Sequence, residues 1–444
     1  MSSDCFNTVL SLYQRCIVAD GVLERLQQQL NLRRRRGIYS MAVVLWLMIW
    51  QRLERRATLS QAVRQLVQGP GRILLVDCKR VREGRISTAA GGYCQSIHKL
   101  PKGVPEQVMR DLVERLSGEL SRPWPGLAVP VFVLDGSSLQ LPYTRKLARA
   151  YPPASNQHGA SHWPILRMVV AHEIGSGMAL HPQWGPMFGA RASSEQGLTM
   201  RVLHDLPEGA VVLADRNFGV FSVAWEATQG GHPVVVRLTK VRAPKLFGGP
   251  IARECDVQVV WKASRWDRAQ AAPWPAGAEI SGRLIAARLG RGKSKQWLYL
   301  FTTLSLPTEQ VVALYGQRWT IETDLRSLKR TVQLHRISSQ SPDGMEKELM
   351  MALCAYNLVR AVMCLAARRA GLPTRRLSFS QVLEVVNYSW AELIGAPTQE
   401  VHNLLFERVL DWAAACKLPQ RRKRRSYPRQ VWGRGGRFPT RKTK

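Results

Sequence analysis

The segment from Tyr315 to Lys329 reads YGQRWTIETDLRSLK and has the periodicity of a helix. With successive residues about 100° apart, four polar side chains fall within a sector of roughly 60°: Tyr315, Arg318, Glu322 and Lys329. Apolar positions lie beside this stripe, so the helix is expected to pack on a core by one flank and to carry the four groups along its edge. Asp324 lies about 160° from Glu322 in the same geometry. Its replacement is therefore expected to affect chemistry at the stripe very little.

A simpler interpretation of this segment is a solvated helix face held by ion pairs. Glu322 is four residues from both Arg318 and Arg326, a spacing that allows ion pairs on a helix, and such surfaces are common. The choice between the two interpretations depends on whether other carboxylates reach the same place.

Two further acidic residues each follow a short apolar run that predicts a strand. Val129 to Leu134 is rich in β-branched residues and is followed by Asp135, whereas Ala210 to Ala214 runs directly into Asp215. Carboxylates at strand ends lie at the rim of a sheet, where several can converge on a metal ion. The sequence therefore predicts that the two aspartates meet.

Such a set of carboxylates suits two hard divalent cations that act on a phosphodiester, one activating the attacking oxygen and the other stabilising the leaving oxygen. We predict that the catalytic and metal-binding residues are Asp135, Asp215 and Glu322. The remaining stripe residues are predicted to bind DNA. Arg318 and Lys329 would hold phosphates on either side of the cut, and Tyr315 would hydrogen-bond to the backbone or stack.

The spacing Y-(2)-R-(3)-E-(6)-K resembles the signature of the insertion-sequence-4 family of bacterial DDE transposases. VLDGSSLQLP around Asp135 is similar to the first aspartate segment of that family. VVLADRNFG around Asp215 is similar to the second, in which glycine more often stands in place of Asn217. The resemblance covers roughly residues 125 to 360.

The resemblance implies an α/β fold with an RNase H-like catalytic core, a β-strand insertion before the glutamate and an N-terminal helical DNA-binding region. It also implies two Mg²⁺ ions, for which Mn²⁺ would substitute. The implied reaction cuts double-stranded DNA at the terminal inverted repeats of a mobile element and joins the ends to target DNA, with a homodimer holding both ends.

Composition agrees with a nucleic-acid partner. The 444 residues include 64 Lys and Arg against 32 Asp and Glu, a net charge of +32 that favours binding to a polyanion. The longest apolar run, Met41 to Trp50, is too short to cross a bilayer. The N-terminus lacks the pattern of a signal peptide, and the eight cysteines form no C-x-x-C pair. We expect a bacterial cytoplasmic protein associated with the nucleoid.

Three regions are expected along the chain. Residues 1–125 would form a helical DNA-binding domain, with a helical scaffold whose charge only solubilises the protein as an equal alternative. Residues 126–370 would form the catalytic domain with its β-strand insertion at about 233–300, and 371–444 a helical C-terminal region with a basic tail. The tail from Arg421 to Lys444 holds eleven Arg and Lys residues and no acid. Further elements are predicted as helices at 22–32, 41–53, 61–67, 105–120, 194–206 and 346–367, and as strands at 165–171 and, more weakly, 178–181.

Two alternatives remain open at this stage. The first is a nuclease or resolvase on the same core that does not transpose, and the second is a catalytically inactive repressor derived from an element. The complete acidic set argues against inactivity. A Gly-Lys-Ser at residues 292–294 lacks the first glycine of a P-loop. His158 and His162 are interpreted as surface loop histidines rather than zinc ligands, and most tryptophans of the insertion as packing residues.

Overall fold

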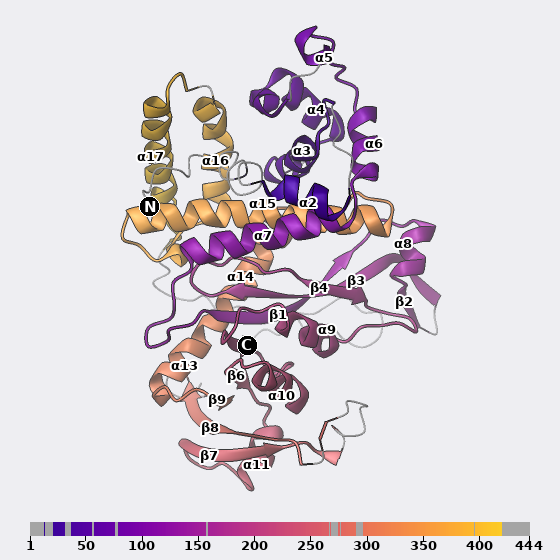
Figure 1. The fold of residues 1–444 in the computed structure, drawn as a ribbon. Helices are drawn as coiled ribbons and strands as arrows, with labels where there is room; N and C mark the ends of the chain where they lie inside the picture. The colour runs from indigo at the N-terminus through magenta and orange to yellow at the C-terminus, as the bar shows by residue number, and fades with distance from the viewer. Residues whose placement is uncertain are drawn as a thin grey trace, which may run out of the picture.

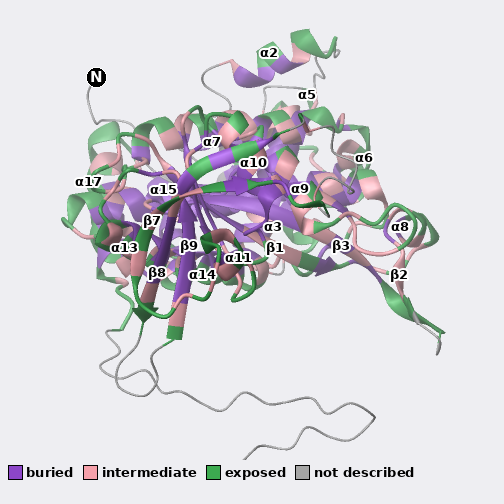
Figure 2. Cartoon of the chain, turned by 90° about the horizontal axis from the view of Figure 1, so that it is seen from below, coloured by how far each residue is buried: buried purple, intermediate pink, exposed green. Residues whose placement is uncertain are grey.

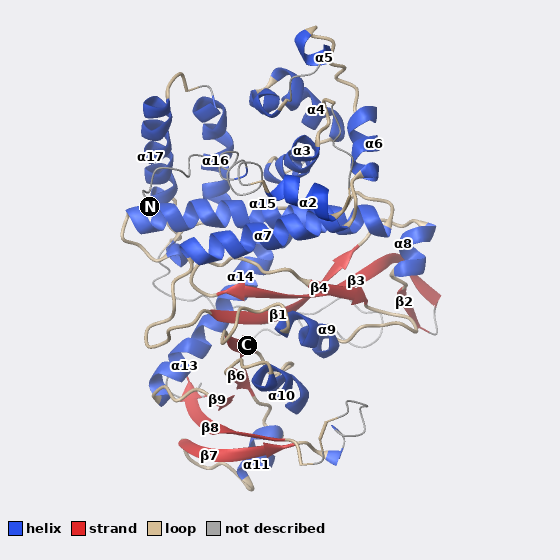
Figure 3. Ribbon diagram, in the orientation of Figure 1, coloured by secondary structure: helices blue, strands red, loops and turns tan. Residues whose placement is uncertain are grey.

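The computed structural model describes Tyr13 and residues 21–31, 37–55, 57–75, 79–156, 159–265, 267, 274–275, 277–289, 296–394 and 396–419. Within these residues a central sheet has helices α7 and α15 along one side and α9 and α10 on the other (Figure 1). Two further groups of helices, α3–α6 and α16–α17, stand on the α7–α15 layer (Figure 3). The mixed α/β class predicted from the sequence is confirmed.

The described strands form one nine-stranded sheet in the order β2-β3-β1-β5-β6-β9-β8-β7, with β4 paired to β3. Strands β1, β5 and β6 are parallel neighbours, and the other pairings are antiparallel. The bounds are β1 Val131–Gln140, β2 Pro153–Asn156, β3 Gly159–Glu173, β4 Gln183–Pro186, β5 Val211–Ala214, β6 Val234–Arg237, β7 Cys255–Lys262, β8 Glu279–Leu289 and β9 Gln296–Thr302.

The strands expected as an insertion continue the central sheet. Strand β6 pairs with β5 on one side and with β9 on the other, and β8 and β7 extend the sheet from there. Trp261 and Trp274 pack around Phe221 of α10 (Phe221–Gln229), at centroid distances of 6.1 and 5.4 Å. These two tryptophans therefore have the packing role expected from the sequence.

The regular elements described before β1 are helical, as predicted. They are α2 Val22–Gln29, α3 Met41–Leu53, α4 Leu59–Gln68, the 3-10 helix η2 Pro70–Leu74, α5 Lys79–Arg82, α6 Gly91–Lys99 and α7 Gly103–Leu120. Helix α3 has the predicted bounds. Helix α4 begins in a capping box, because Thr58 and Gln61 exchange side-chain to backbone hydrogen bonds.

Helix α15 (Pro342–Arg369) is the central helix of the fold. It is long and apolar enough to cross a membrane, but 94% of its most apolar 18-residue window is buried inside the protein (Figure 2). Helices α3, α7, α16 (Phe379–Ile394) and α17 (Gln399–Ala415) all pack on it. It is therefore a core helix shared by the N-terminal, central and C-terminal regions.

Several local expectations differ from the structure. Strand β1 continues to Gln140, so Asp135 lies inside the strand rather than at its end. The strand expected at 178–181 is reduced to a single bridge between Ala179 and His172. Helix α9 spans Glu195–Leu203 and is capped by Ser194, so it ends earlier than expected. The basic tail, Trp266, His158 and residues 292–294 lie outside the described residues.

The remaining helices lie between and after the strands. They are α8 Arg145–Ala150, α11 Arg242–Phe247, α13 Thr308–Gly316, η4 Gln317–Trp319, α14 Thr320–Arg326, η5 Ser327–Thr331 and η6 Thr374–Arg376.

Candidate active site

Asp135 and Asp215 follow residues that pair across two neighbouring parallel strands. The register of β1 and β5 places Leu134 opposite Ala214, and the parallel pairing ends there. Since paired strands lie about 4.8 Å apart, the two aspartates leave the ladder side by side. The structure therefore brings them together, although β1 runs on beyond Asp135 as the partner of β3.

The Asp135 carboxylate lies in an acidic environment. Its pKa is raised to about 6; burial is the largest cause, the negative charges of Asp215 and Glu195 add to it, and the Gly136 amide and Arg318 oppose it. The Gly136 amide donates a hydrogen bond to Asp135 Oδ1 at 2.8 Å. A carboxylate with a raised pKa among other carboxylates is stabilised by a cation.

The segment that carries the polar stripe is helical throughout but not uniform. It passes from α13 through the 3-10 turn η4 into α14 and then into the π-helical η5. Arg318 is buried and stacks on Trp319 at 4.2 Å, and its Nη2 donates to Glu322 Oε1 at 3.4 Å. The Glu322 side chain is 49% exposed. The Arg318–Glu322 ion pair, which the simpler interpretation expects on a solvated helix face, is thus present, but Arg318 lies close to the aspartates.

Tyr315 and Lys329 lie within electrostatic reach of the aspartates. Burial raises the pKa of the Tyr315 hydroxyl, with Arg318 and Arg237 opposing the effect and Asp215 adding to it. Burial lowers the pKa of the Lys329 ammonium, and the charge of Asp135 opposes that change. Tyr315, Arg318 and Lys329 therefore lie near the two aspartates, and Glu322 is connected to them through its ion pair with Arg318.

Sequence reasoning missed Glu195, at the first position of α9. Its Oε2 accepts a hydrogen bond from the Asn217 side chain, two residues after Asp215. A Cβ on residue 136 would lie 2.4 Å from the Glu195 carboxyl group, so a side chain there would displace Glu195. The sequence predicts a helix that begins at Ser194, beside Glu195. No local pattern in the sequence indicates that Glu195 lies near Asp135, 60 residues earlier.

The donor chemistry of this cluster suits a hard divalent ion, because carboxylate oxygens are the ligands that such ions prefer. Asp135 and Asp215 fit that role as they stand. Among the described residues no group of three or more acidic, histidine or cysteine side chains is close enough to hold a metal ion. Glu322, paired with Arg318, would have to turn to complete the set.

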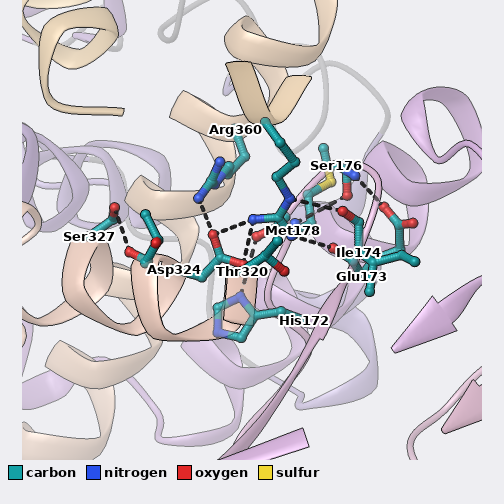
Figure 4. A network of polar contacts seen from close by, with 12 residues as sticks. His172, Glu173, Ile174, Ser176, Met178, Thr320, Asp324, Ser327 and Arg360 are labelled. Carbon is teal, nitrogen blue, oxygen red and sulfur yellow. Dashed lines mark hydrogen bonds and ion pairs between the residues drawn. The ribbon is translucent and has the colours of Figure 1, made fainter. Parts of the chain in front are cut away.

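Asp324 lies away from Glu322, and its side chain is fully buried, which the sequence alone did not indicate. It forms ion pairs with Arg360 of α15 and with Arg375 of η6, and Arg375 Nη1 lies 2.6 Å from its Oδ2 (Figure 4). Burial raises the pKa of Asp324, but the two guanidiniums hold it below its usual range.

The Asp324 network reaches the sheet. Arg375 donates to the backbone oxygens of Ile174 at 2.8 Å and Glu173 at 3.1 Å, at the end of β3, and Arg360 donates to the Tyr356 hydroxyl at 2.9 Å. Helix α14, which carries Glu322, is thereby attached to α15, to η6 and to the end of β3 (Figure 4).

Replacing Asp135 with Asn is expected to stabilise the metal-free protein. The folded state disfavours the charged carboxyl group, whose pKa is about 6 against roughly 4 in an unfolded chain. The loss of folding stability caused by ionising Asp135 is therefore absent below pH 4, grows between pH 4 and 6 and is complete above pH 6. We expect Asp135→Asn to raise the free energy of unfolding by about 1–2 kcal/mol at pH 7.5, with no gain at pH 4.

Urea unfolding at both pH values measures this effect, with Glu309→Gln as a control at an exposed position of α13. If Asp135→Asn were less stable than the original protein at pH 7.5, the charged Asp135 carboxylate would be stabilised by its neighbours even without metal.

Comparison with known proteins agrees with this geometry. A family model described as the transposase DDE domain matches residues 129–358, which is more than half of the chain and includes both aspartates and the polar stripe. The class defined here is thus that of DDE transposases, enzymes that cleave DNA and transfer strands with divalent metal ions.

A full-length relative gives the narrower family. The transposase InsG for insertion sequence element IS4 from Escherichia coli (strain K12) is 27% identical over 442 residues, which cover 97% of this chain and 91% of that protein. This chain belongs to the IS4 family of DDE transposases. Among solved structures, a cryo-EM structure of the piggyBac transposase synaptic complex with hairpin DNA aligns with a TM-score of 0.43 and 10% identity, over 92% of this chain and 85% of that one.

Proposed function

We propose that this transposase cuts DNA at the terminal inverted repeats of its own insertion sequence and joins the ends to target DNA, with Asp135, Asp215 and Glu322 as its metal-binding catalytic residues. The observation that carries this proposal is the pairing of Leu134 with Ala214, which sets the two aspartates side by side next to Arg318 and Glu322. The nuclease and repressor alternatives are not favoured.

An RNase H-like core is part of the proposal. The order β4-β3-β1-β5-β6, with β3 antiparallel to β1 and with β1, β5 and β6 parallel, supports that core. On this basis β7, β8 and β9 constitute the insertion before the glutamate-bearing helix.

Mg²⁺ is the proposed cofactor, as two ions with Mn²⁺ as a substitute. When bound, such ions activate the attacking oxygen and stabilise the leaving oxygen of the phosphodiester. Asp135 and Asp215 would hold them, and Glu322 would join by leaving Arg318. Its half-exposed side chain and the long 3.4 Å contact support such a change of partner.

Arg318 is proposed to bind a DNA phosphate once Glu322 has turned. Its guanidinium is held by the Trp319 ring, and its buried Nε has no hydrogen-bond partner among the described residues. A guanidinium grips phosphate with two hydrogen bonds, whereas the Lys329 ammonium acts as a point charge. Tyr315 would orient the backbone near Asp215.

The basic charge is proposed to hold DNA through its phosphates, with two protomers bringing the element ends together in the bacterial cytoplasm. We expect deletion of Arg421–Lys444 to weaken binding to all DNA sequences alike and to reduce the slope of log affinity against log salt, because eleven cations are removed. Fluorescence anisotropy from 50 to 300 mM salt measures both effects.

A full-length variant with the same tail residues in scrambled order is the control for this deletion, and it should bind like the original. If truncation or scrambling changed the preferred sequence, the tail would be reading bases.

The function is tested by incubating the full-length protein with DNA that carries the inverted repeats flanking its gene. We expect strand cleavage at the repeat ends and joining to a target plasmid in Mg²⁺ or Mn²⁺, and binding without cleavage in Ca²⁺. Cleavage at unrelated sequences without joining would favour a nuclease, and binding without cleavage in all three metals a repressor.

A further inference from the structure

A projecting part of the fold lies outside the site described above. It consists of residues 143–156 and 159–163, named here the arm: helix α8, strand β2 and the first residues of β3. Strand β2 pairs with β3 through Ser155 with Ala160 and Asn156 with Gly159, and the pair extends from the body of the protein (Figure 2). Nothing in the proposed chemistry uses it.

Three rings form a contiguous aromatic cluster on the arm. Tyr143 stacks on His162 with centroids 4.7 Å apart and planes 23° apart, and His162 meets Trp163 edge to face at 4.5 Å. Tyr143 remains 52% exposed and Trp163 44% exposed. Large aromatic side chains usually gain by burial, so two half-exposed rings held in place by a third group suggest a surface that a ligand covers.

The charge of the arm limits what that ligand is. No Asp or Glu occurs between Asp135 and Glu173. Helix α8 presents Arg145, Lys146 and Arg149 to solvent, and none of them forms an ion pair within the described part of the chain. Cations beside aromatic faces, with no acid nearby, match a nucleic-acid strand, whose phosphates the cations neutralise and whose bases stack on the rings.

The arm is also connected to the active site by the sheet. Strand β1 runs from Asp135 to Gln140, a rise of about 17 Å, and the chain enters the arm three residues later. At about 3.4 Å per nucleotide along a strand, the arm lies roughly five or more nucleotides from a phosphate held at Asp135.

We propose that the arm binds the DNA flanking the cut as an unpaired strand, with Tyr143 and Trp163 stacking on bases and the cations of α8 holding phosphates. The inference rests on the proposed binding of DNA at Asp135, which places the arm along the same DNA. Stacking tolerates any base, so this contact adds affinity without sequence preference.

The test measures binding, so it is independent of cleavage. Full-length protein in Ca²⁺ is titrated with two DNAs of equal length, a blunt duplex and a duplex with an eight-nucleotide single-stranded flank that contains 2-aminopurine. Tyr143→Ala and Trp163→Ala are each expected to weaken binding to the flanked DNA about tenfold, to remove the quenching of 2-aminopurine and to leave blunt-duplex affinity within about twofold.

Two sets of control variants distinguish stacking by the arm from the effect of losing any exposed ring and from a loss of folding. Tyr388→Ala and Trp412→Ala remove rings that are 83% and 45% exposed on α16 and α17, and both should bind the flanked DNA like the original protein. Tyr143→Phe and Trp163→Phe keep an aromatic face and should retain quenching.

Equal losses on both DNAs would overturn the proposal, as would arm variants that bind like the controls. If the original protein shows the flank-dependent binding but cleaves no DNA, the catalytic proposal fails and the arm proposal stands.

Discussion

Replacing Glu322 with Gln is expected to abolish metal-dependent cleavage, with a loss of at least about a thousandfold, while affinity for element-end DNA in Ca²⁺ stays within about threefold. Asp135→Asn and Asp215→Asn should have the same effect. The carboxylates position ions rather than hold the duplex, so removing one disables the whole unit. Pairwise combinations should therefore be no worse than single changes.

The measurement is single-turnover cleavage of labelled element ends in Mg²⁺ alongside anisotropy in Ca²⁺. Glu309→Gln is the control, because Glu309 is an exposed carboxylate on α13, just before the polar stripe. It should cleave at the original rate. Undiminished cleavage by Asp215→Asn would remove that residue from the site, even though it lies next to Asp135.

Asp324→Ala is expected to destabilise the protein by about 3–5 kcal/mol, since it leaves two guanidiniums without their shared partner in a buried network. Urea unfolding measures this loss. Thr323→Ala, at the exposed neighbouring position, should change stability by less than about 0.5 kcal/mol.

If Asp324→Ala does not fold, Asp324→Asn replaces it in the measurement, because asparagine keeps the shape of the side chain and removes its charge. Any folded Asp324 variant should lose cleavage through misplacement of α14 while still binding DNA. Stability of both variants within about 1 kcal/mol of the original would mean that Arg360 and Arg375 find other partners.

The two aspartates were predictable because each follows a short apolar run, and neighbouring strands of a sheet share an edge. Helical periodicity predicted the stripe, and the segment from Tyr315 to Lys329 is helical, with 3-10 and π turns within it. Both signals are local or depend on a general rule of sheet geometry.

What the sequence did not reveal depends on contacts between distant segments. The partners of Asp324 are 36 and 51 residues further along the chain, and a helical projection cannot tell a solvated face from one covered by another helix. Glu195 reaches Gly136 through the packing of α9 on β3. The addition of β7–β9 to the main sheet depends on β9 pairing with β6, which strand-like composition does not specify.

The burial of α15 limits how such elements can diversify. Helices α3 and α7 cover one part of it, and Arg52 of α3 forms an ion pair with Glu348 of α15. A gene fusion could replace the first 120 residues with those of another element. It would remove the helices that cover the apolar surface of α15 and leave Glu348 without its partner Arg52. Functional chimaeras should therefore be rare unless α15 is exchanged together with the helices that cover it.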